Sequence, residues 1–576
     1  MGVGMSLGGE EKYDKVVDLA MRRGFFWPSY EIYGGLAGFY DLGPLGTLLK
    51  ENIRNLWLDY FVLKHQDMVV LVETPVIAPE VVFKASGHLE SFTDPIVACS
   101  KCDKIYRADH LLQDLLGVRT EGMRPEELNA IIKEKGVRCP SCGGELSEVR
   151  AFNLLFQTNV GPYRHGTAYL RPEAAQGMFT SFKRVFTSMR YALPVGIAQI
   201  GRVARNEISP RQGMVRLREF TIMEVEFFFD PEEPMTPDFN RFQGRLKILT
   251  AESRRSGVEE PITVKPEEAV AEGIVLNPWL AYWMSVAQAF VKEIGLEEGE
   301  VMFEEKLPEE RAHYSKQTFD QLVAISRWGW VEISGHAYRT DYDLSRHMQF
   351  SGEDMTVYRE LREPKETVVR RVVIDEAVLR ESLGEEAVRV VNVLKSFKAD
   401  EVEKMIKNGE VVVAGFRIPT NALRVVEGVE VVRGRRFVPH VIEPSFGAER
   451  LVLVALDKAY TEEGGRVVLK LPPRIAPYKL AVFPLVTKDQ LIGVAKRIYE
   501  EAVRAGLTVI YDEDGSIGRR YARVDEIGVP FAVTVDYRTL DDGTVTIRLR
   551  DTREQVRVRI DELINWITSR FTASRL

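Results

Sequence analysis

Two segments far apart in the sequence carry arginines in a pattern that suits a phosphate ligand. The first, RNEISPRQGMVRLREFTIMEVEFF from Arg205, is predicted to form strand, turn and strand, with another arginine and an aromatic residue after the turn. The second, VIEPSFGAERLVL from Val441, places an arginine before an apolar stretch typical of a helix. Arginine binds phosphate oxygens in a bidentate way, and an aromatic ring can stack on a base. The segments therefore predict a site for a bent nucleoside triphosphate, held at its α- and γ-phosphates.

The elements that must position these arginines extend over most of the chain. We expect one catalytic unit made of residues 1–98 and 150–470, interrupted by insertions at 99–149 and 351–433. A proline-rich hinge, LPPRIAPYK, then leads to alternating strand and helix patterns at 474–576, which predict a small α/β domain.

Size and composition describe a globular protein of several domains. The chain has 576 residues, 28% charged residues and a net charge of −8, and this length should form three or four domains. The net charge argues against a general polyanion binder, although a local basic surface would still bind a nucleic acid. No apolar run approaches the roughly 20 residues of a membrane span, and the first residues do not have the pattern of a signal peptide. We therefore expect no membrane partner and a cytoplasmic location.

The four cysteines form two close pairs, Cys99-x-x-Cys102 and Cys139-x-x-Cys142. Two such pairs supply the four thiolates of a tetrahedral zinc site. The gap between them is longer than in a usual zinc ribbon, and two stretches typical of helices, ADHLLQDLLG and PEELNAIIKEK, can fill it. The alternative is four buried free thiols. Since four thiolates leave no ligand position open, we expect the Zn²⁺ to be structural.

The two arginine segments resemble motifs 2 and 3 of the class II aminoacyl-tRNA synthetases. The companion segments LRPEAAQGMF from Leu170 and EPSFG from Glu443 narrow the resemblance to the dimeric glycyl-tRNA synthetases of archaeal and eukaryotic type, over nearly the whole chain. The resemblance implies an α+β fold: a class II catalytic domain with an antiparallel sheet flanked by helices, insertions, and a C-terminal α/β anticodon-binding domain. It also implies a homodimer, whose interface would include a helix at about 47–63 and a strand at 68–77.

The resemblance further implies a glycine–tRNA ligase. Such an enzyme uses ATP to convert glycine to glycyl-adenylate and then passes glycine to the 3′ end of tRNA(Gly). The attacking carboxylate is already ionised, so activation depends on positioning and charge stabilisation and needs no general base. Synthesis of dinucleoside polyphosphates would be a secondary activity, if a second ATP attacks the adenylate.

The ATP-site residues follow from the resemblance. Arg205 would hold the α-phosphate and Arg450 would lie on the other side of the nucleotide, so these two are the expected catalytic residues. Glu207 would bind the adenine amino group, Arg216 the γ-phosphate, and Phe220 would stack on adenine. The full expected set is Arg205, Asn206, Glu207, Val215, Arg216, Phe220, Glu332, Ile333, Gly447 and Arg450.

Glycine has no side chain to bind, so its ammonium group must be recognised by carboxylates. The resemblance implies that Glu173, Glu224 and Glu443 supply them, with Ser445 beside them. An unfilled methylene costs only about 1–3 kcal/mol, so alanine would have to be rejected by steric blockage. The full expected set of glycine contacts is Arg107, Glu173, Phe220, Glu224, Glu443 and Ser445.

The chain departs from the family pattern in two segments. Motif 3 reads Phe-Gly-Ala-Glu-Arg where many relatives have Phe-Gly-Leu-Gly-Arg, which places Glu449 at a glycine position. HAYRTDYD replaces the commoner CADRSDYD, so the resemblance assigns no role to Tyr338 or Thr340, although Arg339 is kept. Glu332, shortly before, is the family's expected ligand for a Mg²⁺ that bridges the ATP phosphates.

Two other hypotheses belong to different classes of protein. A non-catalytic relative, like the accessory subunit of a mitochondrial DNA polymerase, would bind nucleic acid and would have no need of the ATP-site arginines. A class II synthetase for threonine or proline would keep those arginines but would have no need of the three glutamates.

Overall fold

The structure is a computed structural model. It describes residues 7–118, 120, 122–162, 166–190, 192–208, 210, 212–395, 397, 399–409, 411–413 and 415–572. The turn predicted within the first arginine segment contains Ser209 and Arg211, which lie outside the described residues. The chain divides into two compact units, Met1–Met355 with Pro439–Leu576, and Thr356–Val438.

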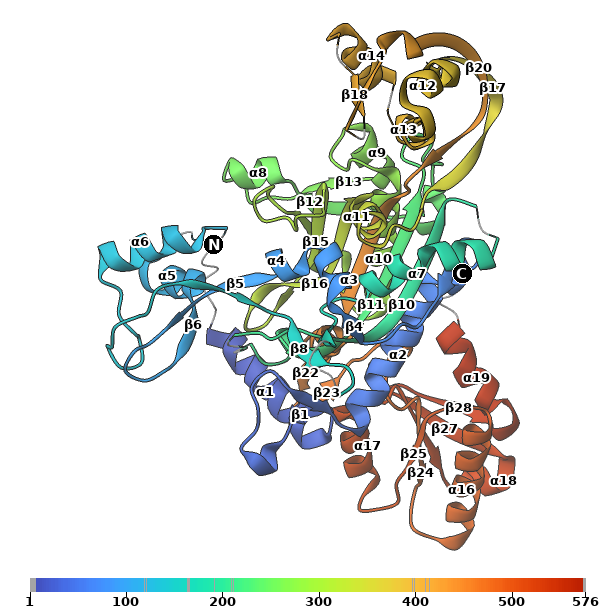
Figure 1. The fold of residues 1–576 in the computed structure, drawn as a ribbon. Helices are drawn as coiled ribbons and strands as arrows, with labels where there is room; N and C mark the ends of the chain where they lie inside the picture. The colour runs from blue at the N-terminus through green and yellow to red at the C-terminus, as the bar shows by residue number, and fades with distance from the viewer. Residues whose placement is uncertain are drawn as a thin grey trace. The chain divides into compact units, whose positions relative to one another are not determined.

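A nine-stranded sheet forms the centre of the larger unit (Figure 1), in the order β13-β12-β14-β15-β16-β21-β11-β10-β3. Its strands are β3 (Val69–Leu71), β10 (Val195–Ala204), β11 (Glu219–Phe229), β12 (Leu246–Leu249), β13 (Ile262–Val264), β14 (Val301–Glu305), β15 (Gln317–Ile325), β16 (Gly329–Thr340) and β21 (His440–Gly447). Neighbours from β14 to β10 pair antiparallel, whereas β3 and β12 run parallel to β10 and β14. The predicted antiparallel sheet is confirmed, with parallel pairs added toward its edges.

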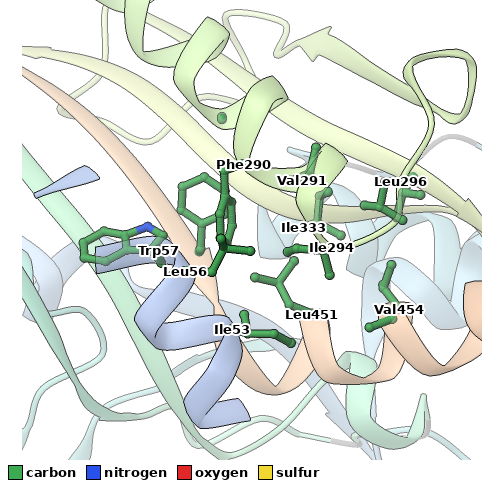
Figure 2. Packing of buried hydrophobic residues seen from close by; sticks show 14 of the residues in the cluster. Ile53, Leu56, Trp57, Phe290, Val291, Ile294, Leu296, Ile333, Leu451 and Val454 are labelled. Carbon is green, nitrogen blue, oxygen red and sulfur yellow. The ribbon is translucent and has the colours of Figure 1, made fainter. Parts of the chain in front are cut away.

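Three helices form the main core with this sheet: α2 (Pro44–Phe61), α10 (Pro278–Glu293) and α15 (Ala448–Ala459). Apolar side chains of these helices, of the residues just after α10 and of β16 meet here (Figure 2). The labelled ones are Ile53, Leu56, Trp57, Phe290, Val291, Ile294, Leu296, Ile333, Leu451 and Val454. Helix α10 is apolar around most of its circumference and is correspondingly buried. Arg450 lies in the first turn of α15, so this core holds that arginine against the sheet.

The strand predicted at 68–77 is wrong as a single element. The chain forms β3 and then leaves the nine-stranded sheet before β4 (Ile77–Pro79), which pairs in a separate three-stranded sheet with β8 (Phe156–Asn159) and β9 (Thr167–Leu170). Pro75 lies in the break, and a proline has no N–H to donate to a strand ladder. The helix predicted at 47–63 is α2, which begins earlier because Pro44 suits a first helical turn.

The cysteine pairs lie in a small α+β segment with its own core. Its three-stranded sheet consists of β5 (Thr93–Ala98), β6 (Ile105–Arg107) and β7 (Arg150–Asn153). The two helices predicted between the cysteine pairs are confirmed as α5 (Ala108–Leu116) and α6 (Pro125–Lys135).

The C-terminal region forms a five-stranded sheet with a separate core. Its elements are β24 (Leu480–Pro484), α16 (Asp489–Arg504), β25 (Val509–Tyr511), α17 (Ile517–Glu526), β26 (Phe531–Val535), α18 (Tyr537–Asp542), β27 (Thr544–Leu549), β28 (Gln555–Arg559) and α19 (Ile560–Thr572). The predicted alternation of strands with helix α16 is confirmed, while α17, α18 and α19 were not predicted.

The smaller unit is built on a long antiparallel ribbon. It comprises β17 (Val357–Ile374), α12 (Glu376–Leu383), α13 (Ala387–Leu394), α14 (Ala399–Lys407), β18 (Val411–Val413), β19 (Phe416–Ile418) and β20 (Leu423–Phe437). Its helices pack on a core of their own. The insertion expected at 351–433 overlaps this unit along most of its length.

The larger unit has further elements besides these sheets and the three core helices, and some of them add side chains to the main core. They are α1 (Leu7–Arg23), β1 (Phe26–Pro28), β2 (Tyr40–Leu42), α3 (Glu80–Ala85), α4 (His88–Ser91), α7 (Ala175–Ser188), α8 (Ala251–Arg255), α9 (Pro266–Ala271), α11 (Tyr342–Ser351), β22 (Tyr460–Glu463) and β23 (Arg466–Leu469). Among the residues described, none of the helices is long and apolar enough to span a membrane.

Candidate active site

A pocket forms where β11, β16 and β21 meet the N-terminus of α15. It brings together nine of the ten residues expected to bind ATP: Arg205, Glu207, Val215, Arg216, Phe220, Glu332, Ile333, Gly447 and Arg450. Asn206 does not line this pocket; its backbone N–H donates to the Leu154 carbonyl at 2.8 Å. Sequence reasoning missed the other lining residues, Met214, Leu217, Ile222, Ser334 and Glu449. Most of these are apolar and had no distinctive spacing to reveal them.

Arg205 follows directly after β10 and is held by its backbone and its side chain. Its N–H donates to the Arg218 carbonyl at 2.8 Å, and its Nε donates to the Pro172 carbonyl at 3.0 Å. The guanidinium carbon lies 5.3 Å from the ring centre of Phe220. The cation and the aromatic face expected for phosphate and adenine therefore lie side by side in the pocket.

Glu207 and Arg216 form an ion pair across the first arginine segment, with Glu207 Oε2 3.2 Å from Arg216 Nε. Arg218, which sequence reasoning did not single out, fixes the same segment. It donates to the Glu207 carbonyl from Nε and Nη2, at 3.0 and 2.8 Å, and to the Ala37 carbonyl from Nη1 at 2.9 Å. A planar guanidinium with several donors can join separate backbone segments in this way.

Arg450 enters the pocket from the side of α15. Its Nε donates to the Val215 carbonyl at 3.1 Å, and its Nη1 lies 3.6 Å from the Glu332 carboxylate. That carboxylate is about half exposed, so an oxygen ligand is available where the phosphates of a nucleotide would lie. The donor type fits Mg²⁺, which binds carboxylate and phosphate oxygens together.

Glu449, the departure from the family pattern, is buried beside Arg450 and accepts several hydrogen bonds. Its Oε2 accepts from the Thr221 N–H at 2.7 Å, and its Oε1 accepts from Arg202 Nη1 at 3.0 Å. These bonds connect the first turn of α15 to β10 and β11. Glu449 therefore helps to fix the motif 3 segment, and with it Arg450, against the sheet in this chain.

The three glutamates expected to bind the glycine ammonium lie together next to this pocket. All are buried, with 1% to 6% of their surface exposed. Glu224 and Ser445 are cross-strand partners on β11 and β21, and the Ser445 hydroxyl, which lines the pocket, donates to Glu224 Oε1 at 2.8 Å. Glu224 Oε2 also accepts from the Ala174 N–H at 2.8 Å.

Arg339 is the cation that holds these carboxylates together, and sequence reasoning gave it no role. It is fully buried and pairs with Asp343 at 2.9 Å, Glu443 at 2.7 Å and Glu173 at 3.4 Å. Burial would raise the pKa of Glu173, but Arg339 and His88 hold it well below its ordinary value. A pocket rich in buried carboxylates needs such a cation, and this requirement is the signal that could have identified it.

Arg107 is not brought to these glutamates. Its guanidinium pairs with Asp94 at 3.1 Å and Asp109 at 2.6 Å. In the part of the chain that the structure describes, its ion pairs go to these two aspartates, and it does not line the pocket. Its expected contact with glycine stays a prediction.

The four cysteines converge on one point. Cys99 Sγ lies 3.4 Å from Cys142 Sγ, Cys102 Sγ lies 3.7 Å from Cys139 Sγ, and all four sulfurs lie within 4.8 Å of one another. A tetrahedral Zn²⁺ with Zn–S bonds of about 2.3 Å separates its sulfurs by about 3.8 Å. The donor set and its spacing therefore fit a zinc ion.

Comparisons with known proteins agree with this arrangement. A family model described as an anticodon binding domain matches residues 479–570. The glycine–tRNA ligase of Aeropyrum pernix is 56% identical over 96% of this chain and 96% of its own. That of Pyrococcus horikoshii is 47% identical over 96% and 97%, and that of Methanocaldococcus jannaschii is 42% identical over 97% and 99%.

The fold also matches a class II synthetase of different specificity. A crystal structure of prolyl-tRNA synthetase from Cryptosporidium parvum matches 97% of this chain and 75% of its own, with a TM-score of 0.52 and 12% identity. The likeness confirms the expected class II architecture and, at this identity, the fold alone. The family follows from the identities to the three relatives above: the chain belongs to the glycine–tRNA ligases.

Proposed function

We propose that the chain carries out its family's reaction in the pocket described above, activating glycine with ATP and ligating it to tRNA(Gly). The observation that carries the proposal is the continuity of two sites. The pocket with Arg205, Phe220 and Arg450 contains Ser445, whose hydroxyl binds Glu224 in the carboxylate cluster. ATP bound by the arginines and glycine bound at the glutamates would thus meet at the α-phosphate.

In this proposal each residue acts on charge or position. The carboxylate of glycine attacks the α-phosphorus of ATP, its new bond forms as pyrophosphate leaves, and Arg205 and Arg450 stabilise the negative charge on the phosphate oxygens. Phe220 and Glu207 hold adenine, and Arg216 holds the γ-phosphate. The anionic glutamates orient glycine through its ammonium group.

Metal ions would support this reaction in two places. Mg²⁺ bound to Glu332 and to the phosphates would neutralise charge on the triphosphate. Zn²⁺ held by the four cysteines would stabilise the segment at 99–149, and with four thiolates it would have no position for substrate. The first role is catalytic and the second structural.

The proposal extends to domains and assembly. The catalytic domain would comprise residues 1–98 and 150–470 with the insertion at 351–433, and the domain at 474–576 would bind the anticodon of tRNA(Gly). We propose a homodimer acting in the cytoplasm. The dimer is supported by apolar surface in the segment at 68–77, where Leu71 on edge strand β3 and Ile77 on β4 are about half exposed. Such edges favour coverage by another chain.

Pyrophosphate exchange into ATP, measured with each of the twenty amino acids, tests the proposal. Exchange with glycine alone supports both the adenylation chemistry and the assignment of the glutamates. Exchange with threonine or proline instead would refute the assignment of the glutamates to glycine binding, while the assignment of the ATP site would remain. The absence of exchange from folded protein with Mg²⁺ would favour a non-catalytic relative. Dinucleoside tetraphosphate formed from excess ATP would reveal the secondary activity.

A further inference from the structure

A fourth glutamate, Glu226, is buried in the carboxylate cluster and has no assigned role. It follows Glu224 by two residues on β11, so the two side chains share a face of the sheet. Oxygens of Glu224, Glu226 and Glu443 lie within 4.8 Å of one another. Glu226 is 0% exposed, and neither of its carboxylate oxygens has a hydrogen-bond partner among the described residues.

The surroundings of Glu226 are dominated by negative charge. The charged groups that act on Glu226 are Glu224 on β11, Glu443 on β21, Arg339 on β16 and Asp343 on α11. Glu173, before α7, pairs with Arg339, and His347 on α11 bonds to Gln176. Arg339 is the cation whose charge acts on Glu226, and its guanidinium is already paired with Asp343, Glu443 and Glu173.

A carboxylate with no donor, close to two others, is strongly disfavoured in its ionised form. Burial, followed by the neighbouring carboxylates, raises the pKa of Glu226 well above its ordinary value. Burial likewise raises the pKa of Glu224, and it raises that of Glu443 to about 8 despite the opposing effect of Arg339. The three groups therefore share at least one proton at neutral pH.

We infer that the cluster of Glu224, Glu226 and Glu443 holds a proton in the free enzyme, that the ammonium group of glycine displaces it to solvent, and that Glu226 is the residue that makes the cluster retain it. The inference rests on the proposed glycine pocket. Glycine brings one positive charge into the cluster and one proton leaves, so the charge of the site is conserved. Glycine binding is then in competition with protons.

This exchange predicts a pH dependence with a definite sign. Below the raised pKa of the cluster, the form that binds ammonium is a minor species, and its fraction grows tenfold for each pH unit. The KM for glycine should therefore fall about tenfold per pH unit between pH 6 and pH 7.5 and level off above the raised pKa. The KM for ATP, measured in the same assays, reports any effect of pH on the nucleotide site.

The variant Glu226→Gln tests the role of Glu226 directly. Glutamine has the shape of a protonated glutamate but cannot ionise, and it removes one charge from the repulsive cluster. No proton can then leave position 226 when glycine binds, so the KM for glycine should fall less steeply with pH over the same range than it does in the wild type. Glu305→Gln is the matched control, because Glu305 is also buried but pairs with Arg311 away from the cluster; it should keep the steep dependence.

If the wild type exchanges pyrophosphate with glycine but its KM for glycine does not change with pH, the inference is overturned and the proposed function is left intact. Steep dependence that persists in Glu226→Gln would overturn the role of Glu226. If glycine supports no exchange at any pH, the proposed function fails and the inference fails with it. The wild-type measurement decides the proton exchange even if a variant does not fold.

Discussion

Replacing Arg450 with alanine should strongly reduce the rate of glycine activation without unfolding the protein. In the structure Arg450 lines the nucleotide pocket and is held by two backbone carbonyls, that of Val215 at 3.1 Å from Nε and that of Glu332 at 2.5 Å from Nη1. Loss of one preorganised donor to developing charge costs about 2.7–4 kcal/mol, which lowers kcat by roughly 10²–10³-fold. The Glu332 carboxylate loses its partner at 3.6 Å, but it is half exposed, so this loss should cost no more than about 1 kcal/mol of stability.

The assay is glycine-dependent pyrophosphate exchange, with kcat and the KM for ATP measured separately, and with a thermal melt of each protein. Lys458→Ala is the matched control, since Lys458 lies on the same helix α15 and pairs with Glu300 at 2.9 Å, outside the pocket. It should change kcat less than about threefold, because neither partner of this part-buried pair lines the pocket. Retention of more than a tenth of the wild-type kcat by Arg450→Ala, with an unchanged melt, would falsify the assignment of Arg450 to the transition state.

Four other changes test separate parts of the account. Ser445→Ala removes the donor to Glu224, so the KM for glycine should rise about 5- to 10-fold, from roughly 1–1.4 kcal/mol for a charge-assisted bond, while the KM for ATP stays constant. Arg339→Met leaves buried carboxylates unpaired and should lower the free energy of unfolding by about 3–5 kcal/mol at pH 7.5. Because acid neutralises those carboxylates, the melting temperature of the variant should approach that of the wild type at pH 5. An equal deficit in melting temperature at both pH values would contradict the ion-pair argument. Cys139→Ser, or a chelator, should release one zinc per chain, as measured by a metal-sensitive dye, and lower the melting temperature; a protein that melts unchanged without metal would exclude a structural role. Leu71→Asp, on the exposed edge strand, should shift the protein from dimer to monomer in light scattering, and a monomeric wild type would rule out the proposed dimer.

The sequence by itself determined the chemistry and the class of fold. The order of Arg205, Glu207, Arg216 and Phe220 along one hairpin is a local pattern, because a strand, a turn and a return strand can place these side chains around one ligand. The cysteine pairs and the helices between them were likewise predictable, since metal-ligand spacing and helical periodicity act over short stretches. The glutamates were found through their motifs.

Only the tertiary structure decided how these parts meet. Strand pairing places Glu224 beside Ser445, and a register cannot be deduced from either strand alone. The same pairing buries Glu226 without a partner and places Arg339 among carboxylates that are distant in sequence. Burial and non-local pairing set the charge of this cluster, because both depend on groups that the chain brings together only on folding. The sequence motifs indicated the reaction, and the fold determined the charge and the geometry of the site that would carry it out.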